Sequence, residues 1–147
     1  MSDLILHLVF GLLTRQNSYS SSLLTNSQIY RRGCDKSSFY YESIQVKVNK
    51  SGYYSFTSYS VIDTHGSIYK NTFNPLNPTE NLFQTEDDTC SDSQFRLDIR
   101  LTSAMKYVLV ITTSELQETS PFWIVVLGDN KVTLKRLSEH THACIVS

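Results

Sequence analysis

Carboxylates gather in one predicted loop of the sequence. Glu86, Asp87 and Asp88 are consecutive, Asp92 follows shortly after, and Asp63 lies in an earlier turn. Calcium takes about six to eight oxygen ligands, which a loop can supply as carboxylates and backbone carbonyls. These five residues are therefore a candidate calcium site, with a spacing unlike that of an EF-hand. The alternative is a loop whose aspartates accept hydrogen bonds from turn amides.

The other reactive residue types form no recognisable site. His140, His142 and Cys144 alternate near the C-terminus, and in a strand they would project from one face. Nitrogen and sulfur ligands suit zinc, but a closed site needs a fourth ligand that this segment lacks. The sequence has no G-x-S-x-G, H-E-x-x-H, G-x-G-x-x-G or phosphate-binding-loop motif. We therefore assign no catalytic residue, expect no enzyme activity, and expect no cofactor other than calcium.

The composition indicates that strands must position these residues. The chain has 147 residues, which suits one domain. Its nine tyrosines and seven phenylalanines, with many serines and threonines, favour strands. The formal net charge of -1 gives no reason to expect nucleic acid or an anionic membrane surface as a partner.

Short runs of alternating or continuous apolar residues recur between turn signals. No window has the periodicity of an amphipathic helix. The predicted strands are residues 39–48, 53–60, 67–73, 82–85, 93–101, 105–113, 120–128 and 131–137. About eight short strands at such spacing predict an all-β fold, an antiparallel β-sandwich or jelly roll.

The strand pattern also predicts the domain boundaries. Residues 1–33 are expected to be a leader or linker, in which an apolar run at residues 4–13 precedes a Ser-rich segment. That run is either the hydrophobic part of a signal peptide or the start of a fragment from a longer chain. Residues 34–137 are expected to form the β-sandwich, and residues 138–147 a tail.

The order of three segments resembles that of a known family. They are YYESIQVKVNKSGYYSF, IDTHGSIYKNTFNPLNPTENLFQTEDD and QFRLDIRLTSAMKYVLVITT. Together they resemble the β-sandwich modules of the bacterial pre-peptidase C-terminal class. They are more similar to a divergent repeat of large extracellular or membrane-tethered invertebrate proteins. The resemblance implies a non-catalytic module, located outside the cell or at its surface, that binds, adheres or acts as a spacer.

Whether the cysteines form a disulfide depends on whether the protein is secreted. In a secreted protein Cys34 and Cys90 would form a disulfide, and the modules that this chain resembles place cysteines at both equivalent positions. Closing that loop of roughly 55 residues would stabilise the fold by about 4 kcal/mol in the loop-entropy account. The alternative is three free thiols in a cytosolic protein. If the disulfide forms, Cys144 is left over, either unpaired in the tail or paired with another chain.

Two surface features accompany this prediction. Asn49 begins an N-K-S sequon in a predicted turn, so it is the expected glycosylation site of a secreted protein. Tyr53, Tyr59 and Tyr69 are the expected binding surface for a sugar or a peptide, because a tyrosine offers a flat apolar body with a polar tip. The aromatic residues expected in the core are Tyr41, Tyr54, Phe56, Phe95, Tyr107 and Trp123.

Two functions are consistent with these observations. The first is a non-catalytic extracellular β-sandwich, monomeric as a module, within a larger adhesion or receptor protein. Its ligand would be a protein or a carbohydrate, and any membrane tether would lie outside this chain. The alternative is an accessory domain of a secreted hydrolase that binds substrate or calcium.

Overall fold

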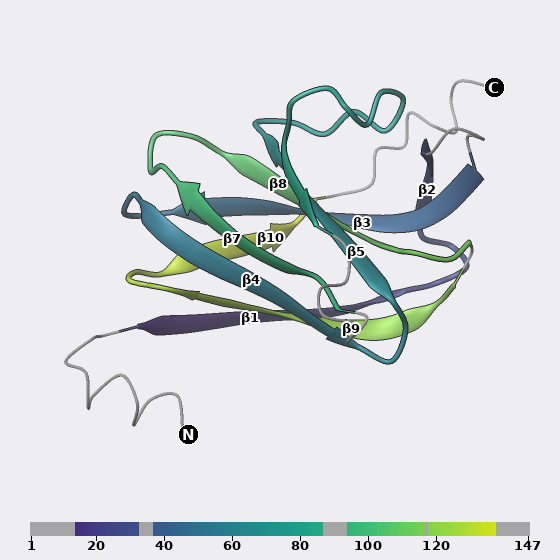
Figure 1. The fold of residues 1–147 in the computed structure, drawn as a ribbon, viewed down its shortest axis with the longest axis horizontal. Coiled ribbons are helices and arrows are strands. Elements are labelled where there is room, and N and C mark those ends of the chain that lie inside the picture. Colours follow the sequence, from purple (N-terminus) through teal and green to yellow (C-terminus); the bar gives the residue numbers. More distant parts are fainter. Residues whose placement is uncertain (1–13, 33–36, 87–93, 117, 138–147) are drawn as a thin grey trace.

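Two antiparallel β-sheets packed face to face make up the fold (Figure 1). The computed structural model describes residues 14–32, 37–86, 94–116 and 118–137. The strands are β1 (Arg15–Leu23), β2 (Gln28–Arg32), β3 (Ser37–Val48), β4 (Gly52–Ser60), β5 (Thr64–Lys70), β6 (Leu82–Glu86), β7 (Arg96–Leu101), β8 (Tyr107–Thr113), β9 (Ser120–Gly128) and β10 (Val132–Arg136). All eight strands predicted from the sequence are present, and β1 and β2 are additional.

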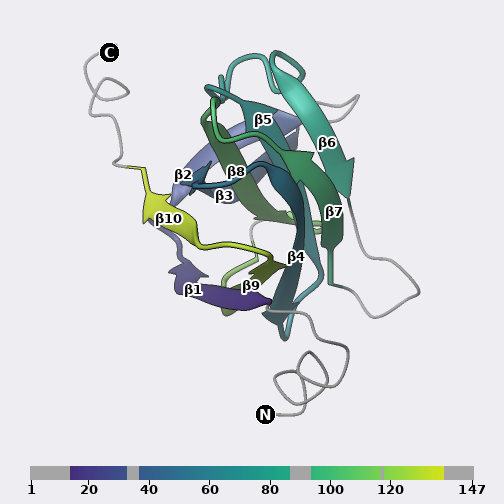
Figure 2. The ribbon, with the colours of Figure 1, turned by 90° about the vertical axis from the view of Figure 1, so that its left-hand side faces the viewer.

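The strand order is that of a jelly roll. The four-stranded sheet has the order β1-β9-β4-β7, and the six-stranded sheet has the order β10-β3-β8-β5-β6, with β2 also pairing with β3. Most consecutive strands therefore pass from one sheet to the other, while β5 and β6 form a hairpin within one sheet. Figure 2 shows the two layers from the end, with β1, β9 and β4 facing β10, β3 and β8. The predicted fold class is confirmed.

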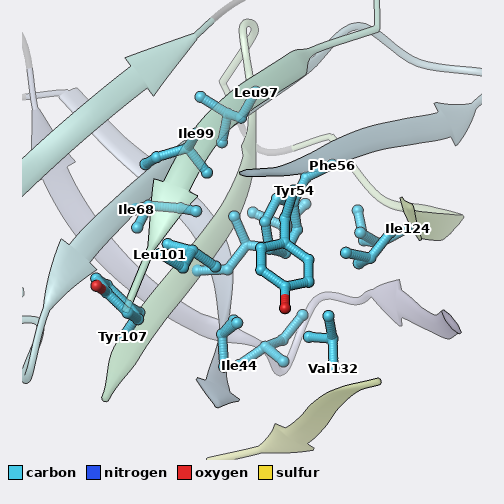
Figure 3. Packing of buried hydrophobic residues seen from close by; sticks show 14 of the residues in the cluster. Ile44, Tyr54, Phe56, Ile68, Leu97, Ile99, Leu101, Tyr107, Ile124 and Val132 are labelled. Atoms are coloured by element: carbon cyan, nitrogen blue, oxygen red, sulfur yellow. The ribbon is translucent and has the colours of Figure 1, made fainter. Parts of the chain in front are cut away.

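The main core lies between the two sheets (Figure 3). The alternation of each strand sends one set of side chains into this layer, as β7 shows with Leu97, Ile99 and Leu101 buried between exposed neighbours. Tyr54 and Phe56 enter it from β4. Of the aromatic residues expected in the core, those that are buried are Tyr41, Tyr54, Phe56, Phe95 and Tyr107.

A second cluster covers the outer face of the six-stranded sheet. Phe73, from the connection between β5 and β6, packs its ring 5.3 Å from that of Tyr41 and 4.7 Å from that of Tyr69. Tyr30 from β2 joins them, 5.5 Å from Phe73. Strand β8 is therefore buried on both faces, and a continuous apolar sequence such as its own is typical of a strand covered on each side.

Residues 1–33 were expected to be a leader or linker, and this expectation is wrong for β1 and β2, which lie within that range. Strand β1 pairs with β9 along its whole length, and β2 pairs with the first half of β3. An edge strand needs few apolar side chains, and β1 buries Leu23 while Tyr19 packs against the core. The serine-rich sequence of β1 therefore gives little indication of a strand, which is held in place by its backbone hydrogen bonds to β9. The apolar run at residues 4–13 and the tail at residues 138–147 lie outside the described residues.

Strand β5 begins earlier than expected. The strand was predicted to begin at residue 67, but Thr64 opens β5 and Gly66 lies inside it. A Cβ atom at Gly66 would lie 2.7 Å from carbons of the Phe95 ring. This glycine therefore serves close packing of the core and not a turn.

Candidate functional site

The outer face of the four-stranded sheet carries exposed aromatic rings on a side that no other described element covers. We use "outer face" for the outward side chains of β1, β4, β7 and β9. The strand register places Ser20, Trp123 and Tyr59 in one row across β1, β9 and β4. Trp123 is 51% exposed and Tyr59 is 52% exposed. Side chains paired across antiparallel strands lie about 5 Å apart at their Cβ atoms, so the two residues are neighbours on this face, and we call the pair the platform.

The expectation that Trp123 belongs to the core is wrong. Strand β9 sends Phe122, Ile124 and Val126 inward, so the alternation of the strand turns Trp123 outward. The sequence of β9 is apolar on both faces, which is typical of a strand that is covered on each side. The second sheet covers only the inner face of β9, so Trp123 on its outer face is left exposed to solvent.

Tyr53 lies on the same outer face but far from this platform. It is six residues from Tyr59 on β4, or about 20 Å along an extended strand. It is 73% exposed, and the guanidinium carbon of Arg100 lies 5.8 Å from the centre of its ring. Tyr53 and Tyr59 are thus exposed as expected, in two separate places.

A groove of about 740 Å³ adjoins Trp123. It is lined mainly by small polar side chains from β1 and the β1–β2 turn, by part of β9, and by one arginine. We call it the Trp123 groove. The lining residues are Ser20, Ser21, Ser22, Leu24, Asn26, Ser27, Pro121, Phe122, Trp123 and Arg136.

A buried carboxylate holds the strands beside the groove together. Glu42 of β3 is 5% exposed. One of its oxygens accepts a hydrogen bond from the Tyr19 hydroxyl, and the other accepts one from Ser21 Oγ at 2.7 Å. Arg136 Nε of β10 lies 3.9 Å from the same carboxylate. Glu42 therefore connects β1 and β10 to β3, with both oxygens engaged.

The electrostatics of this cluster favour the neutral phenol. Burial, followed by the hydrogen bond to Glu42 and the charge of its carboxylate, raises the pKa of Tyr19 well above its usual value. Tyr19 therefore remains a hydrogen-bond donor to Glu42 throughout the physiological range. The sequence did contain a signal for this role, because Glu42 shares the inward face of β3 with Ile44 and Val46. A carboxylate in an apolar row must have partners, and we did not assign it any from the sequence.

The predicted calcium residues are only partly described. The backbone of Glu86 pairs with Gly66 near the start of β5, and Asp63 immediately precedes that strand, so both lie toward the same end of the six-stranded sheet. The Asp63 carbonyl accepts a hydrogen bond from the Ser114 amide at 3.1 Å. Among the residues that the structure describes, no three His, Cys, Asp or Glu side chains are grouped to hold a metal ion. The other predicted ligands, Asp87, Asp88 and Asp92, lie outside the described residues, so calcium binding stays a prediction.

The remaining predicted site residues have different outcomes. Tyr69, expected on the binding surface, is 3% exposed, because β5 turns it into the second cluster, where its hydroxyl donates to the Pro78 carbonyl at 2.7 Å. Asn49 is exposed in the β3–β4 turn, a position accessible to glycosylation. The cysteines and C-terminal histidines lie outside the described residues, namely Cys34, Cys90, His140, His142 and Cys144.

The fold resembles that of solved structures at low sequence identity. A mitogen derived from Yersinia pseudotuberculosis is 14% identical, with a TM-score of 0.50 over 87% of this chain and 98% of that chain. The CBM35 domain of a Cellvibrio japonicus protein is 11% identical, with a TM-score of 0.41 over 82% of this chain and 100% of that one. A cleaved adhesin domain of Lys-gingipain from Porphyromonas gingivalis is 15% identical, with a TM-score of 0.36 over 86% of this chain and 99% of that one. No protein-family model and no curated protein matches the chain.

The likeness to the Yersinia mitogen bears on the fold alone. It agrees with the two-sheet architecture and leaves the use of the surface to be argued from this chain's own residues. In the part of the chain that the structure describes, no helical segment has the length and hydrophobicity needed for a membrane span.

Proposed function

We propose that this chain is a non-catalytic binding module of a larger surface or secreted protein, and that it holds its ligand at Trp123. The observation that carries this proposal is the exposed pair of rings, Trp123 and Tyr59, on an uncovered sheet face beside a polar groove. A half-exposed Trp leaves a large apolar area in contact with water, and such area is a common mark of an interaction site. Trp and Tyr are also the side chains that most often dominate binding energy.

The contrast between the two sheets supports this assignment. The outer face of the six-stranded sheet also bears aromatic residues, but Phe73 and Tyr30 of the chain itself cover them. The outer face of the four-stranded sheet has no such cover among the described residues. Its platform is therefore available to another molecule.

The extracellular setting is part of the proposal. It is supported by the exposed sequon at Asn49 and by the resemblance to pre-peptidase C-terminal modules. The proposed disulfide between Cys34 and Cys90 requires the same oxidising setting.

Glu42 is the described carboxylate beside the groove. Both of its oxygens accept hydrogen bonds, from Tyr19 and Ser21, so it supports the strands.

The alternative function is an accessory domain of a secreted hydrolase. It would use the same platform but bind the substrate of a catalytic domain on another part of the protein. Binding to a polymer that is also degraded by the parent protein would favour this alternative. Binding to a cell-surface ligand without turnover would favour an adhesion module.

Fluorescence provides a direct test, because Trp123 is the single tryptophan of the chain. We expect a member of a panel of polysaccharides and extracellular-matrix proteins to change its emission on titration. Binding measured by calorimetry should be lost in Trp123→Ala and kept in Leu76→Ala, which truncates an exposed apolar side chain in the β5–β6 connection. A ligand that binds both variants equally would contradict the proposed site.

A further inference from the structure

We infer that the ligand is a neutral oligosaccharide that lies across the strands, from the Trp123 groove over Trp123 to Tyr59. This inference rests on the proposed function and adds the chemical class and the direction of the ligand. The rings, the lining of the groove and the charges each support it.

The rings favour a flat apolar partner. Trp123 and Tyr59 are directly paired on neighbouring strands, so two exposed aromatic side chains lie next to each other on this face. A pyranose ring has an apolar face of C–H groups that stacks on such a surface, while its hydroxyl groups point to the sides. The small side chain of Ser20 on the other side of Trp123 leaves the approach to the indole open.

The groove offers hydrogen bonds at the side of this platform. Its lining includes the hydroxyl groups of Ser20, Ser22 and Ser27 and the amide of Asn26. Each hydroxyl group can both donate and accept, and an amide does both through different atoms. This capacity matches the hydroxyl groups of a sugar, each of which also donates and accepts.

The charges favour a neutral ligand. The one charged residue of the lining is Arg136, and its guanidinium faces the carboxylate of Glu42. On the nearby part of β7, Arg96 pairs with Asp98 at 3.2 Å. The formal charges are therefore balanced in pairs, and the site has no excess charge to attract an acidic glycan.

The positions of the rings determine the direction in which the oligosaccharide lies on the sheet. Ser20, Trp123 and Tyr59 form a row that runs across three strands. Tyr53, in contrast, is about 20 Å away along β4 and is separated from the platform by Ser55 and Thr57. An oligosaccharide that runs from the groove across the row contacts Tyr59 and does not reach Tyr53.

The test uses isothermal titration of the full chain with cellohexaose, xylohexaose and mannohexaose as neutral probes, and with heparin and polygalacturonate as anionic ones. We expect at least one neutral probe to bind, and Trp123→Ala and Tyr59→Ala each to weaken it by at least ~10-fold. The matched control is Tyr53→Ala, the same truncation on the same face of the same strand, which should leave binding within about twofold.

Each other outcome overturns the inference in a distinct way. Binding of the anionic probes alone would refute the neutral ligand, and equal losses in Tyr53→Ala and Tyr59→Ala would refute the direction. If no glycan binds while a protein of the panel binds and requires Trp123, the oligosaccharide is wrong and the proposed function stands. If nothing in either set binds, both are wrong. Trp123→Phe keeps an aromatic ring and should retain part of the affinity, which separates stacking from a folding defect in Trp123→Ala.

Discussion

Replacing Glu42 with glutamine tests whether the buried carboxylate holds the groove-lining strand β1 in place. The change keeps the shape of the side chain and removes its charge. Hydrogen bonds to a charged group contribute about 1.5–3 kcal/mol each, and neutral ones about 0.5–1.5 kcal/mol. The bonds from Tyr19 and Ser21 should therefore each weaken by about 1 kcal/mol. The exposed side chain of Arg136 adds at most about 1 kcal/mol, because solvent screens its ion pair.

We therefore expect Glu42→Gln to lower the free energy of unfolding by about 2–3 kcal/mol. Urea unfolding followed by far-UV circular dichroism measures this change, and the exposed Glu115→Gln is the matched control, with an expected effect below about 0.5 kcal/mol. A double-mutant cycle with Tyr19→Phe should give a coupling of about 1 kcal/mol. If Glu42→Gln matches its control, or if the two changes are additive, the carboxylate does not hold β1 as described.

Three further predictions concern the core, the tyrosines and the acidic loop. Gly128→Ala would place a Cβ atom 2.1 Å from a carbon of the Tyr54 ring on β4, so it should lower the free energy of unfolding by at least ~2 kcal/mol in urea. The control Gly52→Ala has open space around it and should cost less than about 1 kcal/mol. Equal effects of the two changes would contradict the packing argument. Burial raises the pKa of Tyr69 in the folded protein. The contribution of the neutral phenol to stability is therefore complete below the unfolded pKa of about 10 and is lost as the pH rises above that value. In unfolding curves at rising alkaline pH, the free energy of unfolding should fall more steeply for the wild type than for Tyr69→Phe. Millimolar calcium should raise the midpoint of thermal unfolding under non-reducing conditions, and a rise that persists in Asp87→Asn with Asp88→Asn would exclude the acidic loop as the site.

Several parts of the fold were predictable from the sequence because alternation is a local property. The pattern of β7 fixes which of its residues face the core, whatever that core contains. The continuous apolar run of β8 likewise indicated burial on both faces, and the structure supplies the second cluster that covers it. Strand β1 escaped prediction because an edge strand is held mainly by backbone hydrogen bonds to β9, which leave little trace in side-chain type.

What the sequence determined by itself is therefore which residues of a strand share a face, since that depends only on the twofold repeat of an extended chain. Only the tertiary structure decided which of the two faces is covered. It buried Tyr69 in the second cluster, against residues of β2, β3 and β8, and left Trp123 in solvent, although both are aromatic residues of predicted strands. It also brought Tyr19 and Arg136 to Glu42 from strands distant in the sequence. Covering a face and pairing a charge both require contacts between distant segments, and the order of the two sheets sets those contacts.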